Sequence, residues 1–130
     1  MNRSAEAAPG REHRVSQPTI DAFAEVSGGI APIHTDPEYA RSTPFGGTLV
    51  HGMYLVGLIE RELCARAPGW DASGTVDVTF RRPVRAGEPF TIHLAGDPAR
   101  DEEFGVTVRT ENGTAVTGVV RGRPGRDDER

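Results

Sequence analysis

The stretch TLVHGMYLVGLIERELCAR, residues 48–66, carries the strongest periodic signal in this chain of 130 residues. Leu49, Met53 and Val56 fall along one side of a helix, and Val50, Leu55, Leu58 and Leu63 widen the apolar surface. A helix that is apolar over so much of its circumference is usually buried at the centre of a domain. The pattern therefore predicts a central helix over residues 48–66, ended by Pro68-Gly69.

The sequence after this helix alternates between apolar and polar residues. Segments around residues 75–80, 90–94, 104–108 and 115–120 have this period of two, which is typical of half-buried strands. Asn112-Gly113 is a strong signal for a two-residue hairpin between the last two segments. With a further strand expected over residues 12–15, the sequence predicts an α+β fold in which an antiparallel sheet wraps around the long helix.

The sequence before the central helix predicts two shorter helices. Ser16 as N-cap and Pro18 in the first turn begin one helix, and Gly28 ends it. A loop is expected over residues 30–35, and Asp36 is expected to cap a second short helix that runs to about Ser42.

Composition and charge narrow the class of protein. All 15 basic residues are arginine and face 19 acidic residues, for a net charge of -4. The missing lysine excludes a Schiff base and a P-loop, and the scattered arginines give no footprint for nucleic acid. Cys64 stands alone, so no internal disulfide is possible. No apolar run reaches the length of a membrane span, and the opening residues lack the apolar region of a secretory signal.

We therefore expect a soluble, cytoplasmic protein with one domain. The domain is expected over residues 11–123, between polar tails over residues 1–10 and 124–130 that lack periodicity. No metal and no cofactor is expected.

Three motifs resemble one known family. They are FAEVSGGIAPIHTDPEYA (residues 23–40), FGGTLVHGM (residues 45–53) and FRRPVRAG (residues 80–87). Their order and spacing, over about residues 11–122, resemble the MaoC-like hydratases, which comprise the (R)-specific enoyl-CoA hydratases and related dehydratases. This resemblance implies a hot-dog fold, in which an antiparallel sheet wraps around one long helix.

The resemblance also implies a site, with one departure. The family pattern in the first motif is Ser-Gly-Asp-x-Asn-Pro-Ile-His, and here Gly29 replaces the Asp and Ala31 the Asn. By the resemblance, His34 is the remaining acid/base residue, and the backbone N–H of Gly52 holds the thioester oxygen of an acyl-CoA or acyl-carrier-protein substrate. Because a positioned acid/base group contributes about 10²- to 10⁴-fold, the missing Asp argues against ordinary hydration.

Several readings follow from that departure. His34 alone could serve a reassigned reaction such as dehydration, isomerisation or cyclisation. Asp36 or Asp77 could replace the carboxylate, although we expect Asp36 to be an N-cap and Asp77 to face outward. The alternative is a non-catalytic hot-dog subunit, or an acyl-binding partner in a heteromeric hydratase. A third possibility is a hot-dog thioesterase, which would need an acidic residue near the acyl tunnel. Glu60 and Glu62 lie too late on the helix for that role.

The remaining candidates surround these residues. Three arginines have two possible roles. They either bind the phosphates of CoA or of a carrier protein's phosphopantetheine arm, or they form a solvated corner. They are Arg81, Arg82 and Arg85. His51 is expected to form a hydrogen bond near the start of the long helix rather than to catalyse. The resemblance and the size of the chain together imply a homodimer or higher homo-oligomer, which would also cover an open sheet edge. The residues expected to line an acyl chain are Pro32, Ile33, Met53 and Tyr54.

Overall fold

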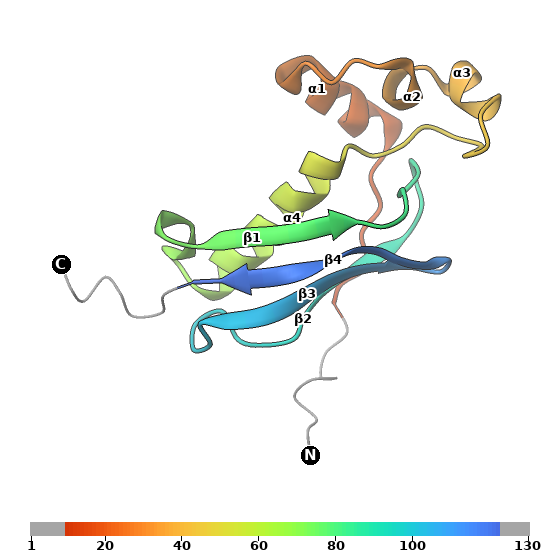
Figure 1. Ribbon diagram of the computed structural model, residues 1–130. Coiled ribbons are helices and arrows are strands. Elements are labelled where there is room, and N and C mark those ends of the chain that lie inside the picture. The colour runs from red at the N-terminus through yellow and green to blue at the C-terminus, as the bar shows by residue number, and fades with distance from the viewer. Residues whose placement is uncertain (1–9, 123–130) are drawn as a thin grey trace.

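A four-stranded antiparallel sheet lies against one long helix in the computed structural model, which describes residues 10–122 (Figure 1). The helix is α4 (Gly52–Arg66), and the sheet has the strand order β1-β4-β3-β2. This arrangement confirms the α+β hot-dog fold. The strands are β1 (Thr75–Phe80), β2 (Phe90–Leu94), β3 (Glu103–Thr110) and β4 (Gly113–Arg121), and a short 3-10 turn, η2 (Trp70–Ala72), joins α4 to β1.

The core forms where alternate residues of the central strands meet α4. Val106 and Val108 on β3 and Val116 and Val120 on β4 are almost completely buried, as the period of two predicts. Leu55, Leu58, Ile59 and Leu63 of α4 belong to the same apolar cluster. Each fully buried side chain of this kind contributes about 1.5–3 kcal/mol, so the layer contact holds the start of α4 firmly in place.

The first three helices gather at one end of the molecule, where α4 begins (Figure 1). They are α1 (Gln17–Ser27), α2 (Pro32–Thr35) and α3 (Pro37–Arg41). Ser16 caps α1 by accepting from the N–H of Thr19, and Gly28 ends it with a φ of 83°. Asp36 caps α3, as predicted, by accepting from the N–H groups of Glu38 and Tyr39.

Three local predictions were wrong, and tertiary pairing explains the first of them. The central helix begins at Gly52 and not at Thr48, because residues 48–50 are drawn into extended pairing with residues 84–86. The expected strand over residues 12–15 is reduced to one bridge between His13 and Phe90. The expected loop over residues 30–35 contains α2, which Pro32 begins.

The predicted domain bounds, residues 11 and 123, stay a prediction. Apart from Gly10, the two predicted tails lie outside the described residues, as does residue 123 of the predicted domain. Within residues 10–122, no helix is long and apolar enough to cross a membrane.

Candidate active site

His34 lies on α2, and its ring is oriented by a backbone carbonyl. Nδ1 is 2.8 Å from the carbonyl oxygen of Leu49. A carbonyl only accepts, so Nδ1 carries the hydrogen and donates it. In the neutral ring the lone pair is then on Nε2, which forms no hydrogen bond among the described residues. The half-buried imidazole of His34 therefore presents Nε2 as a base.

Gln17 fixes the backbone that carries His34. Its Nε2 donates to the carbonyl oxygen of His34 at 2.8 Å and to Oδ1 of Asp21 at 2.9 Å. Its Oε1 accepts from the hydroxyl of the buried Thr48 at 2.5 Å. The Gln17 side chain of α1 thus joins α2 to the segment before α4 and fixes their positions relative to each other. Sequence reasoning missed Gln17, because a polar residue in the first turn of a short helix looks like any exposed side chain.

His51, the N-cap residue of α4, is buried with only 7% of its surface exposed. Its Nε2 donates to the carbonyl oxygen of Gly29 at 2.8 Å, so the expected hydrogen bond near the helix start is present. Its ring stacks on that of His34, with centroids 3.9 Å apart and planes inclined by 17°. Phe23 meets the His51 ring edge-on at 5.0 Å. The two imidazoles therefore form one packed pair between α2 and α4.

The backbone at Gly29 places the missing side chain beside this pair. A Cβ built on Gly29 would lie 2.9 Å from Cδ2 and 3.0 Å from Nε2 of His51. The position where the family carries an Asp thus points at the His51 ring. Within residues 10–122, no ion pair or hydrogen bond joins His34 or His51 to a carboxylate.

The other two carboxylates that were considered lie elsewhere. Asp36 is engaged as the cap of α3, and Asp77 is exposed on β1, where its carboxylate lies 4.0 Å from the Arg121 guanidinium. Neither has a hydrogen bond or ion pair to the imidazole pair, as the sequence interpretation expected.

Gly52 is the first residue of α4 and follows directly on His51. The N–H groups of a first helical turn have no partner inside the helix, and no described residue accepts from that of Gly52. A Cβ on Gly52 would lie 2.8 Å from Cζ of Phe80, so any larger residue here would displace either that ring or the start of α4. The free N–H and the positive end of the helix dipole make this a place where a negative oxygen would be stabilised.

The predicted substrate residues fall into two groups. Pro32 and Ile33 lie beside His34 on α2, and Met53 and Tyr54 lie in the first turn of α4. Met53 is 64% exposed, whereas the half-buried Tyr54 meets the ring of Phe23, the same ring that touches His51. Pro32 and Ile33 are thus neighbours of His34 along α2, and Met53 and Tyr54 directly follow His51 and Gly52 along the chain.

Arg81 and Arg82 are exposed just after β1. Arg81 follows Phe80, the residue that covers Gly52, and the Arg82 guanidinium lies against the backbone of Gly113 in the predicted hairpin between β3 and β4. Both arginines lie beyond the strand end that meets the start of α4, and Arg82 is turned toward the hairpin.

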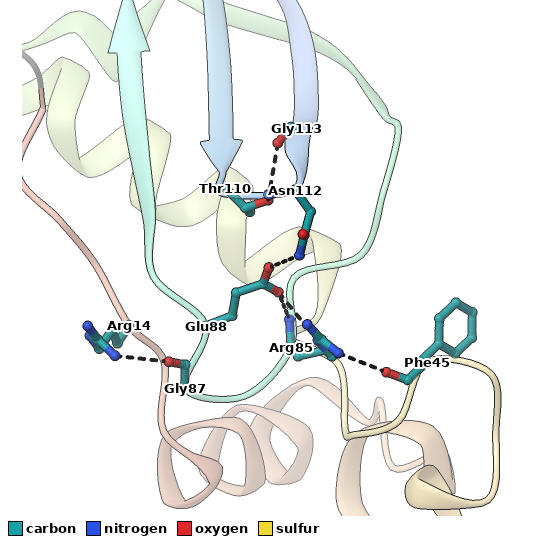
Figure 2. Close-up of polar contacts among 8 residues, drawn as sticks. All are labelled: Arg14, Phe45, Arg85, Gly87, Glu88, Thr110, Asn112 and Gly113. Atoms are coloured by element: carbon teal, nitrogen blue, oxygen red, sulfur yellow. Dashed lines mark hydrogen bonds and ion pairs between the residues drawn. The ribbon is translucent and has the colours of Figure 1, made fainter.

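Arg85 has a different setting, which Figure 2 shows. Its guanidinium donates to the carbonyl oxygen of Phe45 at 3.3 Å and pairs with Glu88 at 3.7 Å. Glu88 also accepts from the side chain of Asn112 at 3.2 Å. Arg85 thus ties the loop before Thr48 to the corner between β1 and β2, and the β3–β4 hairpin shares the same network. Of the two readings offered for Arg85, these contacts favour the structural corner.

Cys64 lies outside this site, late on α4. Burial, with the charge of Asp71 second, raises the pKa of the Cys64 thiol above its ordinary value. Cys64 is half-buried on α4, packed against the core, and its thiol is consequently a poor nucleophile. Within the described residues, no group of three or more His, Cys, Asp or Glu side chains is arranged to hold a metal ion.

Comparisons with known proteins agree with this geometry. The family model described as "MaoC like domain" matches residues 3–119. The chain is 32% identical to an (R)-specific enoyl-CoA hydratase of Rhodospirillum rubrum over 112 residues, which cover 83% of this chain and 76% of that protein. It is 42% identical over 77 residues to a 3-hydroxybutyryl-CoA dehydratase of Methylorubrum extorquens, covering 57% of this chain and 48% of the relative. The match thus spans about half the length of that dehydratase.

Solved structures show the same likeness. The (R)-hydratase from A. caviae involved in PHA biosynthesis superimposes with a TM-score of 0.64 and 28% identity, covering 89% of this chain and 97% of the other. Fold, motif order and family model agree along nearly the whole chain, and the protein belongs to the MaoC-like domain family.

Proposed function

We propose that this protein is a MaoC-like acyl hydratase or dehydratase that acts on an acyl thioester of CoA or of a carrier protein, with His34 as its acid/base residue. The observation that carries the proposal is the bond from His34 Nδ1 to the Leu49 carbonyl, which leaves Nε2 free as a base. The names of the relatives support the reaction class, because both are a hydratase or a dehydratase of CoA thioesters.

The proposed chemistry needs two groups at the reacting atoms. In dehydration, His34 Nε2 takes the proton from C2 of a 3-hydroxyacyl thioester, and the electrons move onto the thioester oxygen. The N–H of Gly52 donates a hydrogen bond to that oxygen. As the double bond between C2 and C3 forms, the His34 imidazolium returns its proton to the departing C3 hydroxyl, which leaves as water. Hydration is the reverse.

Gly29 restricts this chemistry to a single acid/base side chain. In the family the carboxylate and the imidazole share the work on one water, and here His34 does both transfers. That arrangement favours a reassigned reaction whose second proton transfer is easy, such as isomerisation of an enoyl thioester or elimination from an activated substrate. No cofactor enters any of these steps.

The residues around the pair are proposed to hold the substrate. Pro32, Ile33, Met53 and Tyr54 would contact the acyl chain, since they border His34 and Gly52. Arg81 and Arg82 would bind the phosphates of the carrier arm, since both are exposed beyond β1. We propose that the active form is at least a homodimer. The cytoplasmic location stays a prediction.

The test is a hydration assay on a short 2-enoyl-CoA with four forms of the protein: wild type, His34→Ala, Gly29→Asp and Gly29→Asn. We expect slow hydration by the wild type and none by His34→Ala. Gly29→Asp should raise the rate by about 10²- to 10⁴-fold, because it adds a second acid/base group beside the pair. Gly29→Asn has the same shape without the charge and should not raise it. Wild-type activity that survives His34→Ala would overturn the assignment of His34.

Gly29 also favours a second function, that of a non-catalytic subunit or acyl-binding partner. In that case the wild type would be inert, and Gly29→Asp would remain inert on its own. A stable complex with a second hot-dog chain, formed on co-purification and active only as the complex, would then replace the first proposal.

A further inference from the structure

We propose that His51 is a positioning residue for His34, whose stacked ring holds the acid/base imidazole in one orientation and stabilises the charge that it gains. This inference rests on the proposed function of His34. This role goes beyond the hydrogen bond that the sequence predicts for His51. A bond to Gly29 alone requires neither an imidazole nor its stacking on His34.

The hydrogen bonds of His51 leave one nitrogen unexplained by a purely structural role. Nε2 donates to the Gly29 carbonyl, so the lone pair of the neutral ring is on Nδ1. Nδ1 is buried and has no hydrogen-bond partner among the described residues. A buried polar atom without a partner costs free energy. The hydrogen bond to Gly29 therefore does not account for an imidazole at this position, and the contact that remains to be explained is the one made by its face.

The face of His51 lies against His34. The two planes are inclined by only 17°, with centroids 3.9 Å apart, which is close stacking. When His34 takes a proton during turnover, it becomes a cation over the π face of the buried His51 ring, an arrangement that is attractive. The carboxylate that would otherwise stabilise this charge is absent at Gly29, so the stacked ring supplies part of its effect.

The position of His51 is itself fixed from three sides. The Gly29 carbonyl holds Nε2, the edge contact with Phe23 supports the ring, and the N-cap position joins the backbone to α4. Because α4 is anchored in the core, the His51 ring at its N-cap has a fixed orientation. The His51 ring in turn fixes the orientation of the His34 ring stacked on it. Reacting groups must be held to within about 1 Å, since a displacement of that size costs about 10²-fold in rate.

The experiment compares three substitutions that separate the ring from the hydrogen bond. His51→Phe keeps a stacking ring and loses the bond to Gly29, His51→Asn keeps a donor and loses the ring, and His51→Ala loses both. His93→Phe on β2 is the matched control, because His93 lies outside the site and bonds to Thr91. Each variant is assayed for kcat and KM on the 2-enoyl-CoA that the wild type hydrates, and its folding is checked by circular dichroism.

We expect His51→Ala to lower kcat by about 10- to 100-fold with little change in KM, because the substrate still binds while the base is misplaced. His51→Phe should recover most of kcat, and His51→Asn should not. Recovery by Asn but not by Phe, or an unchanged kcat in His51→Ala, would overturn the proposal.

Long-range ¹H–¹⁵N spectra of the histidine rings give a readout that does not depend on turnover. The wild type should show His34 as a single Nδ1–H tautomer and His51 as the Nε2–H tautomer. In His51→Ala the uncovered His34 ring should turn away from the Leu49 carbonyl, which otherwise fixes its tautomer, so its signals should become those of a tautomer mixture. His51→Phe keeps the stacked ring and should leave the signals unchanged. A single His34 tautomer in His51→Ala would overturn the positioning role. If the wild type is inert but the spectra behave as expected, the proposed function fails and the positioning role stands.

Discussion

At the scale of single residues, two glycines have opposite relations to the site. The carbonyl oxygen of Gly29 accepts a hydrogen bond from His51, and Gly29 has no side chain where the family pattern has a carboxylate. Gly52 has an N–H without a partner, and the ring of Phe80 covers its Cα. The first glycine lies where the family pattern has an Asp, and the second has no Cβ that would meet the Phe80 ring above it.

We therefore expect Gly52→Ala to damage the proposed oxyanion contact. The new Cβ would lie 2.8 Å from Phe80 Cζ, so either the ring or the start of α4 must move. Loss of one oxyanion donor costs about 10²- to 10³-fold in kcat, which a steady-state assay would measure. Gly57→Ala is the control, because nothing lies within 4 Å of its Cβ. Equal effects of the two substitutions would show that Gly52 has no special part in catalysis.

The sequence predicted some of these residues and not others, for a physical reason. His34 and Gly52 lie in motifs that can be recognised locally. Gln17 acts on His34 across 17 positions and His51 on Gly29 across 22, through contacts that exist only after folding. No local pattern carries such contacts, so the stacked pair and its supports could not be predicted.

At the scale of elements, α4 shows how tertiary pairing competes with helical pattern. Residues 48–50 continue the apolar pattern of the helix, yet Val50 donates to the Val84 carbonyl and Ala86 to the Thr48 carbonyl. The helix starts four residues later than predicted, at the position that frees the Gly52 N–H. The strands were easier to predict, because a period of two continues through β1 to β4 and Asn112-Gly113 forms the expected hairpin.

Two histidines, one on strand β2 and one stacked against it, should make the free energy of unfolding depend on pH. Burial first, and then Arg11 and Arg61, lower the pKa of His13, which stacks on Phe90 at the start of β2. Burial and then Arg109 lower the pKa of His93 on β2. Between the ordinary value of 6.5 and these lower values, the unfolded chain binds more protons than the folded one. The contribution of these two histidines to the free energy of unfolding should therefore be complete above pH 6.5. The free energy of unfolding should fall as the pH drops through this window.

Urea unfolding at pH 7.5 and pH 5.5 measures this loss. The double variant His13→Asn, His93→Gln should lose less stability over the same interval, because two of the groups that bind protons only on unfolding are gone. Equal losses in both proteins would show that other groups govern the acid sensitivity.

At the scale of the whole molecule, β1 is an open edge of the described sheet. It pairs with β4 on one side only, and Phe80 at its end is 50% exposed beside Gly52. An unpaired edge strand invites another strand, which is the physical basis for the proposed homodimer.

Analytical ultracentrifugation should therefore give twice the 14.0 kDa mass of the chain. Thr79→Arg on β1 would bring like charges close together across a two-fold edge and should shift the protein toward monomer. Ala99→Arg, exposed in the connection between β2 and β3, is the matched control and should remain dimeric. A monomeric wild type, or dissociation by both substitutions alike, would contradict pairing through β1.

The bond from His51 to Gly29 has a consequence for how such a site evolves. Its acceptor is a backbone carbonyl, which every amino acid has, so the bond does not depend on which residue occupies position 29. A carboxylate can be lost or regained there by one codon change, provided that the His51 ring shifts away from the new Cβ. Descendants of one ancestral gene could in this way differ at position 29 while the loop and the bond from His51 to the backbone are inherited.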